Sequence, residues 1–150
     1  MIVVICGPPA AGKSTLTERV RERLEAAGRT VHTVHSDDFS RRTYERMYER
    51  VAAGPEGIWL VDGTFYDREW QVQFQTLEDV RFVHVTASLE TCLERNRARE
   101  EAIDEQGVHV VYREFDEPDA DLTIDTDDCT IEEATEQVLA AIERWTDDAV

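Results

Sequence analysis

The sequence predicts an α/β fold in which helices cover both faces of a parallel sheet. Short apolar runs rich in branched residues alternate with polar segments of helical spacing along all 150 residues, and this alternation is typical of parallel sheets. The first run, residues 2–6, leads through a glycine-rich turn directly into a helix. Because this length suits one core, residues 1–150 are expected to form a single domain.

The first half of the chain contains three expected strands and the helices between them. Leucine and valine recur at helical spacing after the glycine-rich turn, and Gly28 ends that helix. Branched residues at 30–35 predict the second strand, and the polar helical segment 44–53 closes at the turn 54–57. The third strand, residues 58–61, is apolar throughout, as expected for a strand that is buried on both faces.

The second half of the chain continues the alternation. A helix over 67–77 precedes a strand at 81–85, and a further helix starts at Ser88 and runs to residue 99. After a mixed segment, a short strand at 122–125 leads into the closing helix. That helix keeps its apolar residues on one face, at Ile131, Ala134, Val138, Ala141, Ile142 and Trp145.

The glycine-rich turn reads GPPAAGKS and fits the pattern G-x-x-x-x-G-K-[ST] at a strand-to-helix junction. Its glycines let successive backbone N–H groups point at a phosphate, and the following helix offers the positive end of its dipole. The Lys13 ammonium can reach the outer phosphates, and the Ser14 hydroxyl can take a position on Mg²⁺. An ordinary glycine-rich turn is the alternative. The predicted nucleotide-binding residues are Gly7, Pro8, Pro9, Ala10, Ala11, Gly12, Lys13, Ser14 and Thr15.

Lys13 is the only lysine among the 16 lysine and arginine residues of the chain. Lysines tolerated on the surface would be scattered through the sequence, whereas here the single ammonium stands where the phosphate motif requires one. The planar guanidinium of arginine would not fit the same small cradle. The composition therefore supports a chemical role for Lys13.

The net charge of -17, from 33 acidic residues, bears on partners and environment. Such a surface repels nucleic acid in dilute salt, so no DNA partner is expected. Scarce lysine with abundant acidic residues is also typical of adaptation to a very salty, halophilic cytoplasm. Salt there screens the repulsion between the acidic surface and nucleic acid, so an RNA partner remains possible. Cys6, Cys92 and Cys129 show no paired spacing and are expected to be free thiols in a reducing cytoplasm. No signal segment or membrane-spanning run is recognised, so we expect a soluble cytoplasmic protein.

Two aspartates, Asp37 and Asp38, end the second strand. Ligands of such sheets bind at the carboxyl ends of the strands, where an aspartate can accept the proton of an acceptor hydroxyl. Asp38 is predicted to do so, with Arg41 one helical turn away, and Asp37 is left open as a second participant. The alternative role for Asp38 is a helix N-cap.

Asp62 ends the third apolar strand, where a carboxylate can hold Mg²⁺ or its waters together with Ser14. A turn aspartate before Gly63 is the alternative. The four histidines, by contrast, lack metal-ligand spacing, so strand or loop contacts are expected for His32, His35, His84 and His109.

Arginines at 95, 97 and 99 fall where a short lid, near residues 95–115, could fold over the phosphates. Positions i and i+4 share a helix face, so Arg95 and Arg99 are predicted to act together and Arg97 to turn aside. A bidentate guanidinium matches the oxygens of a transferring phosphoryl group. The alternative is a solvated helix face that pairs with acidic neighbours, namely Glu94, Glu100 and Glu101.

Several stretches together resemble those of the archaeal seryl-tRNA(Sec) kinase. They are the phosphate loop, HSDDFSR at 35–41, VDGTFY at 61–66, ASLETCLERN at 87–96, YREFDEP at 112–118 and TIDT at 123–126. The chain is also similar to the killer-toxin-insensitivity ATPases of tRNA modification and, more distantly, to adenylylsulfate kinase and the polynucleotide 5′-kinases.

This resemblance implies a three-layer P-loop NTPase of the nucleoside-kinase type, with a five-stranded parallel sheet of order 2-3-1-4-5. It also implies Asp38 as base, Arg41 as its partner, and Arg95 and Arg99 as lid arginines. The chain departs from the seryl-tRNA kinase in ending after one closing helix, with no separate tRNA-gripping domain. Gly63 and Phe65 also stand in the stretch where that family carries an asparagine.

The sequence therefore predicts a phosphotransferase that uses ATP and Mg²⁺ and acts on a hydroxyl of a small molecule or an RNA-linked acceptor such as tRNA. The alternative is a P-loop ATPase that serves as a nucleotide-driven accessory factor in tRNA modification.

Overall fold

The computed structural model describes residues 1–99 and 102–148 of the chain. Strands and helices alternate through these ranges as the sequence predicts. In chain order the elements are β1 (Ile2–Cys6), α1 (Lys13–Ala26), β2 (Val31–His35), the single-turn helix η1 (Ser36–Asp38), α2 (Thr43–Ala53), β3 (Ile58–Gly63), α3 (Arg68–Gln75), β4 (Val80–Thr86), α4 (Leu89–Arg97), α5 (Glu105–Glu114), β5 (Leu122–Asp125) and α6 (Ile131–Asp148).

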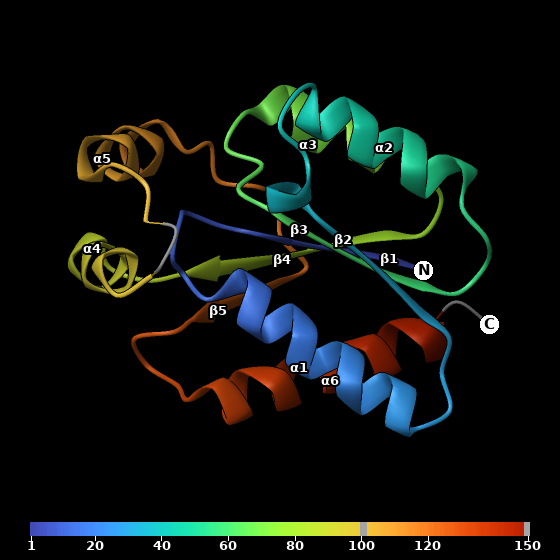
Figure 1. Cartoon of the computed structure of the whole chain (residues 1–150). Helices are drawn as coiled ribbons and strands as arrows, with labels where there is room; N and C mark the ends of the chain where they lie inside the picture. Colours follow the sequence, from blue (N-terminus) through green and yellow to red (C-terminus); the bar gives the residue numbers. More distant parts are fainter. Residues whose placement is uncertain (100–101, 149–150) are drawn as a thin grey trace.

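The five strands form one sheet in the order β2-β3-β1-β4-β5, and every neighbouring pair is parallel. This confirms the predicted sheet and its order. Two register pairs matter for the site, because Asp62 of β3 lies opposite Ile5 of β1 and also opposite His35 of β2. The carboxyl ends of the three strands therefore meet at one edge, where β1 continues into the glycine-rich loop (Figure 1).

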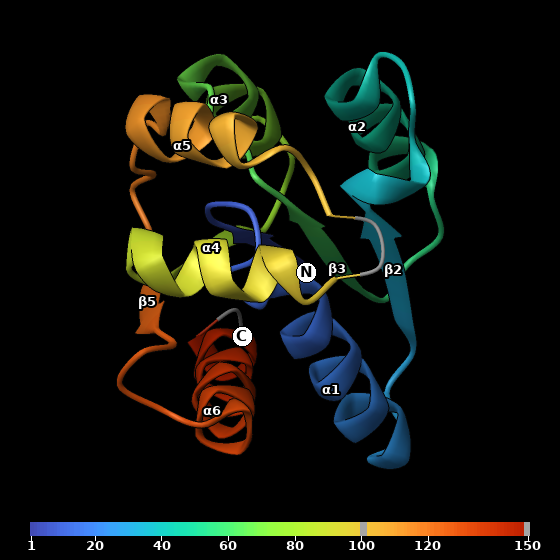
Figure 2. The same ribbon diagram turned by 60° about the vertical axis from the view of Figure 1, so that its left-hand side comes forward.

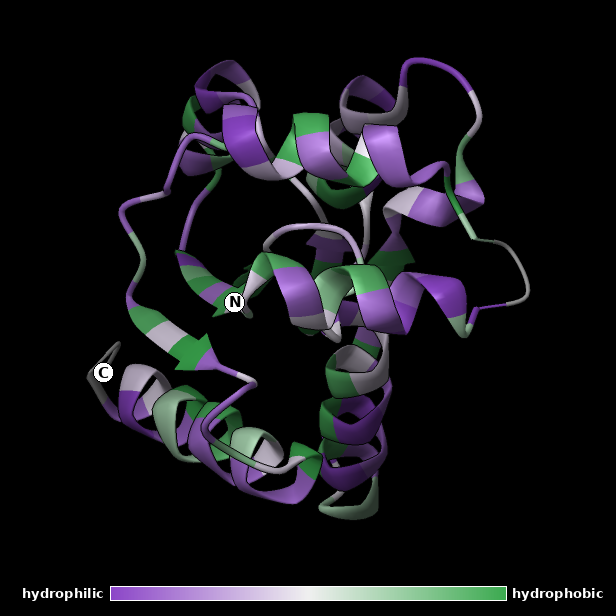
Figure 3. Cartoon of the chain, turned by 90° about the vertical axis from the view of Figure 1, so that its left-hand side faces the viewer, coloured by the Kyte–Doolittle hydropathy of each residue, from purple (hydrophilic) through white to green (hydrophobic). Residues whose placement is uncertain are grey.

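Helices cover the two faces of the sheet in pairs, α1 and α6 on one side and α2 and α3 on the other (Figure 1). Val20 and Val138 are fully buried in the first core, and Met47 and Phe74 in the second. Hydrophobic and hydrophilic residues alternate along α6, and its buried residues lie on the predicted face (Figure 3). No helix in the described part of the chain has both the length and the apolar character needed to cross a bilayer.

The structure differs from the expected elements between residues 97 and 115. The helix α4 ends at Arg97 with Ala98 as its C-cap, so Arg99 lies beyond the helix and does not share a helix face with Arg95. The segment expected to be mixed contains α5, whose one buried residue is Val108. This helix contains Gly107 and three valines, which have low helix propensity, so its composition did not indicate a helix. The described residues between 95 and 115, which the sequence predicts as a lid, thus contain the end of α4 and the whole of α5.

The side chain of His84 on β4 makes stability depend on pH. It is 8% exposed and stacks on Phe115, with 5.3 Å between the ring centroids. Burial lowers the pKa of His84, although the charge of Glu117 acts in the opposite direction. The unfolded chain therefore binds a proton at a higher pH than the folded chain does, and stability is lost as the pH falls through about 6.5.

We expect the unfolding free energy of the wild type to fall more steeply between pH 7.5 and pH 5 than that of His84→Gln. Urea denaturation at both pH values measures this difference, and the acidic residues contribute equally to both proteins. The exposed His109 provides the control, since His109→Gln should follow the wild type. Equal slopes for the wild type and His84→Gln would show that His84 accepts its proton freely in the folded state.

Candidate functional site

The loop between β1 and α1 is shaped by backbone conformations that small residues permit. A β-carbon on Gly7 would lie 2.0 Å from the carbonyl oxygen of Val85, so this position has no room for a side chain. Ala10 and Gly12 adopt left-handed conformations, with φ of 63° and 104°. The helix α1 starts after Gly12 without a side-chain cap, so an anion can bind the N–H groups of its first turn.

A cavity of about 440 Å³ opens beside this loop, at the carboxyl edge of the sheet. Its walls come from the loop and α1, from the ends of β2 and β3, and from the lid segment, which lies beside the loop (Figure 2). Among the predicted site residues, those that line the cavity are Pro9, Ala10, Gly12, Lys13, Ser14, Thr15, Asp62, Arg95 and Arg99. Three further loop residues that were predicted to bind nucleotide are not among the lining residues, namely Gly7, Pro8 and Ala11.

The Lys13 ammonium stands in this cavity and donates a hydrogen bond to the Pro8 carbonyl oxygen at 2.7 Å. Burial lowers the pKa of Lys13 to about 8, and the nearby negative charge of Asp62 limits that decrease. Lys13 therefore remains charged at neutral pH. Because one of its three donors is used by the loop itself, the others are available to a ligand.

The carboxylate of Asp62 is buried, with 2% of the residue exposed, and accepts a hydrogen bond from Nδ1 of His35. The second ring nitrogen of His35, Nε2, contacts Oε1 of Glu18 at 3.1 Å. The pKa of His35 rises to about 9, mainly because of the hydrogen bond to Asp62, although partial burial opposes the rise. The sequence indicated only a strand or loop contact for His35. Its partner Asp62 lies on another strand, and only the strand order and register bring the two side chains together.

The oxygen donors in the cavity suit Mg²⁺. Ser14 and Asp62 supply a hydroxyl and a carboxylate, the hard donors that this ion takes alongside phosphate oxygens. Within residues 1–99 and 102–148, no three side chains of His, Cys, Asp or Glu gather as ligands for a metal ion.

The two aspartates of η1 differ in position. Asp37 lines the cavity, and its Oδ2 lies 3.9 Å from Nη2 of Arg99, on the lid side. Both aspartates are exposed, but Asp38 and the exposed Arg41 are not among the lining residues, so their assigned roles stay predictions. The sequence could not distinguish two adjacent aspartates, because the choice depends on how a single helical turn is oriented.

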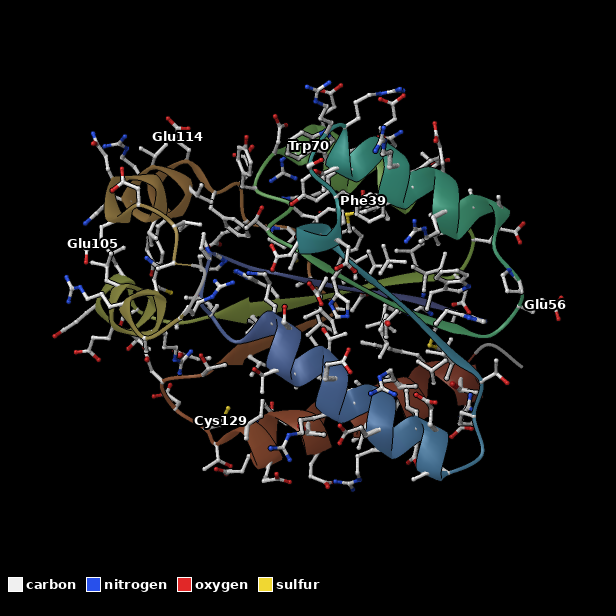
Figure 4. The ribbon with its side chains drawn as sticks, in the orientation of Figure 1. Phe39, Glu56, Trp70, Glu105, Glu114 and Cys129 are labelled. Atoms are coloured by element: carbon white, nitrogen blue, oxygen red, sulfur yellow. The ribbon has the colours of Figure 1, made fainter. Side chains whose placement is uncertain are left out.

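Arg95 and Arg97 make separate contacts. Nη1 of Arg95 donates to the Ala11 carbonyl oxygen at 3.0 Å and to the Thr126 hydroxyl at 2.9 Å, so Arg95 ties α4 to the phosphate loop. Arg97 pairs with Glu105, which lies on the outside of α5 (Figure 4). Of the acidic residues offered as the alternative partners, Glu100 and Glu101 lie outside the described residues.

Aromatic residues support the wall beside β3 from behind. The hydroxyl of Tyr44 bonds to the cavity-lining Thr64 at 2.8 Å and accepts the backbone N–H of Phe65 at 3.1 Å. Trp70 of α3 stacks on Tyr44 of α2 with 4.3 Å between ring centroids (Figure 4). Phe65 is fully buried, so it packs in the core rather than stacking on a ligand.

The fold is that of P-loop kinases in known structures. The Mycobacterium tuberculosis APS kinase CysC, solved with AMPPNP and APS, superposes with a TM-score of 0.79 at 18% identity, covering 95% of this chain and 96% of that one. The Chaetomium thermophilum Kti12, solved with ADP-AlF3, superposes with a TM-score of 0.77 at 17% identity, covering 95% of this chain and 99% of that one. A gluconokinase from Sinorhizobium meliloti 1021 superposes with a TM-score of 0.74 at 16% identity, covering 98% of this chain and 94% of that one.

Sequence comparison adds the family. A search of curated proteins finds no match to this chain. The family model described as an AAA domain matches residues 2–123, which is most of the sequence. The phosphate loop, all strands up to the start of β5 and the lid fall within that match. The chain belongs to this AAA domain family.

Proposed function

We propose that this protein is an ATP-dependent phosphotransferase that moves the γ-phosphate of ATP to a hydroxyl of an acceptor. One observation carries the proposal. A carboxylate, Asp37, and a lid arginine, Arg99, face each other 3.9 Å apart beside a cavity that also holds the Lys13 ammonium. A cation for the phosphates, an arginine for the transferring group and a base for the acceptor are the parts that phosphoryl transfer needs.

The phosphate side of the site is the loop and the start of α1. The loop amides and Lys13 bind the triphosphate, and the left-handed turn at Gly12 directs the chain into the helix whose dipole favours the anion. Ser14 and Asp62 are the residues that would hold Mg²⁺, which when bound neutralises charge on the phosphate oxygens.

The acceptor side is the carboxyl end of β2. The acceptor oxygen forms a bond to the γ-phosphorus while the bond from that phosphorus to the bridging oxygen breaks, and ADP leaves with the electron pair. The proton of the acceptor hydroxyl passes to the Asp37 carboxylate. Arg99 stabilises the charge on the equatorial oxygens. The role that the sequence assigned to Asp38 is therefore proposed for its neighbour Asp37, which lines the cavity.

A nucleotide-driven accessory ATPase is the second candidate. Arg95 and Thr126 both bond to the Ala11 carbonyl oxygen in the phosphate loop, so a change in the loop can be transmitted to α4 and to the segment after β5. The likeness to Kti12 is a likeness of fold and leaves this candidate open.

Incubation of the protein with γ-labelled ATP and cell extract, at high salt, tests the proposal and identifies the acceptor class. The extract is divided into RNA and small-molecule fractions, and Lys13→Ala serves as the control without phosphate binding. Label that appears in one fraction with the wild type, and not with the control, supports transfer and assigns the acceptor. Release of labelled phosphate alone supports the accessory ATPase, and neither transfer nor release contradicts both.

A further inference from the structure

Three residues from separate elements meet beneath the cavity. His35 ends β2, Asp62 is its register partner on β3, and Glu18 lies one turn into α1. The imidazole joins the two carboxylates, with Nδ1 on Oδ2 of Asp62 and Nε2 on Oε1 of Glu18. Side chains alternate along a strand, and both β2 and β3 direct these residues to the face that α1 covers.

This contact is one-sided. His35 bonds to Oδ2 of Asp62. Because Asp62 also lines the cavity, its other oxygen, Oδ1, is left for a ligand in the cavity. Because Asp62 is 2% exposed, little water competes for its carboxylate. With both ring nitrogens bonded, the imidazole is fixed in orientation, and through it the plane of the carboxylate is fixed too.

The other histidine of the same strand behaves differently. His32 lies on the opposite face, where it stacks on Trp59 with 4.7 Å between ring centroids and contacts the Glu56 carbonyl oxygen at 3.2 Å. Glu56 lies at the far end of the molecule from the lid (Figure 4). His32 thus packs against the sheet, and it offers a matched histidine without any contact to the cavity.

We propose that His35 is a positioning residue for Mg²⁺: held by Glu18, it fixes one oxygen of Asp62 so that the other is presented to the ion or its waters. This inference rests on the proposed function, since it assigns a role in the same nucleotide site. Outer partners of this kind set the orientation of a ligand, and their loss typically weakens metal affinity by about 10–100-fold.

The test measures ADP binding to the full-length protein by calorimetry, first in EDTA and then over a series of Mg²⁺ concentrations. The Mg²⁺ midpoint is the Mg²⁺ concentration at which ADP affinity has made half of its total increase. We expect this midpoint to be about 10-fold higher or more in His35→Ala than in the wild type. The ADP affinity in EDTA should change by less than about threefold, because Asp62 then has no ion to orient. This metal-specific difference is one that a general loss of packing would not produce.

Matched variants separate the possible results. Glu18→Gln weakens the hold on the imidazole while keeping the shape, so a smaller shift in the same direction is expected. This half-buried helix position tolerates the isosteric change if His35→Ala fails to fold. His32→Ala should leave the Mg²⁺ midpoint at the wild-type value. An unchanged or lower midpoint in His35→Ala and Glu18→Gln overturns the inference and leaves the proposed function standing. If ADP binding to the wild type does not depend on Mg²⁺, the inference is overturned. If the wild type binds no nucleotide, the proposed function is overturned as well.

Discussion

Replacing Arg99 with alanine is expected to lower the rate of phosphoryl transfer by about 1,000-fold, the lower end of the range for arginines that stabilise a transferring phosphoryl group. Arg99 lines the cavity from the lid, and its guanidinium reaches the same region as Asp37. Its charge acts on the γ-phosphate, so ADP affinity should change by no more than a few-fold. Single-turnover transfer of labelled phosphate to the acceptor fraction measures the rate, and calorimetry measures ADP binding.

Arg97→Ala is the matched control for Arg99→Ala. Arg97 is two residues away in the sequence, but its guanidinium pairs with Glu105 on the outside of α5. Exposed ion pairs contribute little, so this variant should transfer phosphate at the wild-type rate. Equal rates for Arg99→Ala and the wild type would remove the lid arginine from the mechanism. A large loss in Arg97→Ala would point instead to the lid fold as a whole.

Replacing Asp37 with asparagine is expected to lower phosphoryl transfer by about 100-fold or more, the usual contribution of a positioned base. Asparagine keeps the shape of the side chain but accepts no proton, and ATP affinity should be retained because the loop and Lys13 bind the phosphates. Single-turnover transfer and ATP binding are measured on the same preparations.

The adjacent aspartate serves as the control in this case. Asp38→Asn should keep most of the transfer rate, because Asp38, unlike Asp37, is not among the residues that line the cavity, although both are exposed. If Asp38→Asn loses transfer and Asp37→Asn keeps it, the base is the residue that the sequence predicted. If neither variant affects phosphate release from ATP in the presence of a partner, the accessory ATPase becomes the better explanation.

Local patterns predicted the sheet and the phosphate loop. The order of strands followed from the family resemblance, and the loop was identified because its glycines and Lys13 stand at fixed spacing after a buried strand. Such features are properties of neighbouring residues, so they are readable along the chain. The segment 95–115 was less predictable, since Gly107 and the valines of α5 disfavour a helix and α4 ends at Arg97, where no glycine or proline marks the end.

The sequence by itself determined the fold class, the position of the phosphate loop and the strand ends at which polar residues would gather. Only the tertiary structure decided which of two adjacent aspartates lines the cavity, that Arg99 lies beyond the end of α4, and that His35 bonds to Asp62. The reason is physical. A side chain's neighbours across a parallel sheet come from segments that are distant along the chain, and their pairing depends on strand order and register, which no local pattern contains.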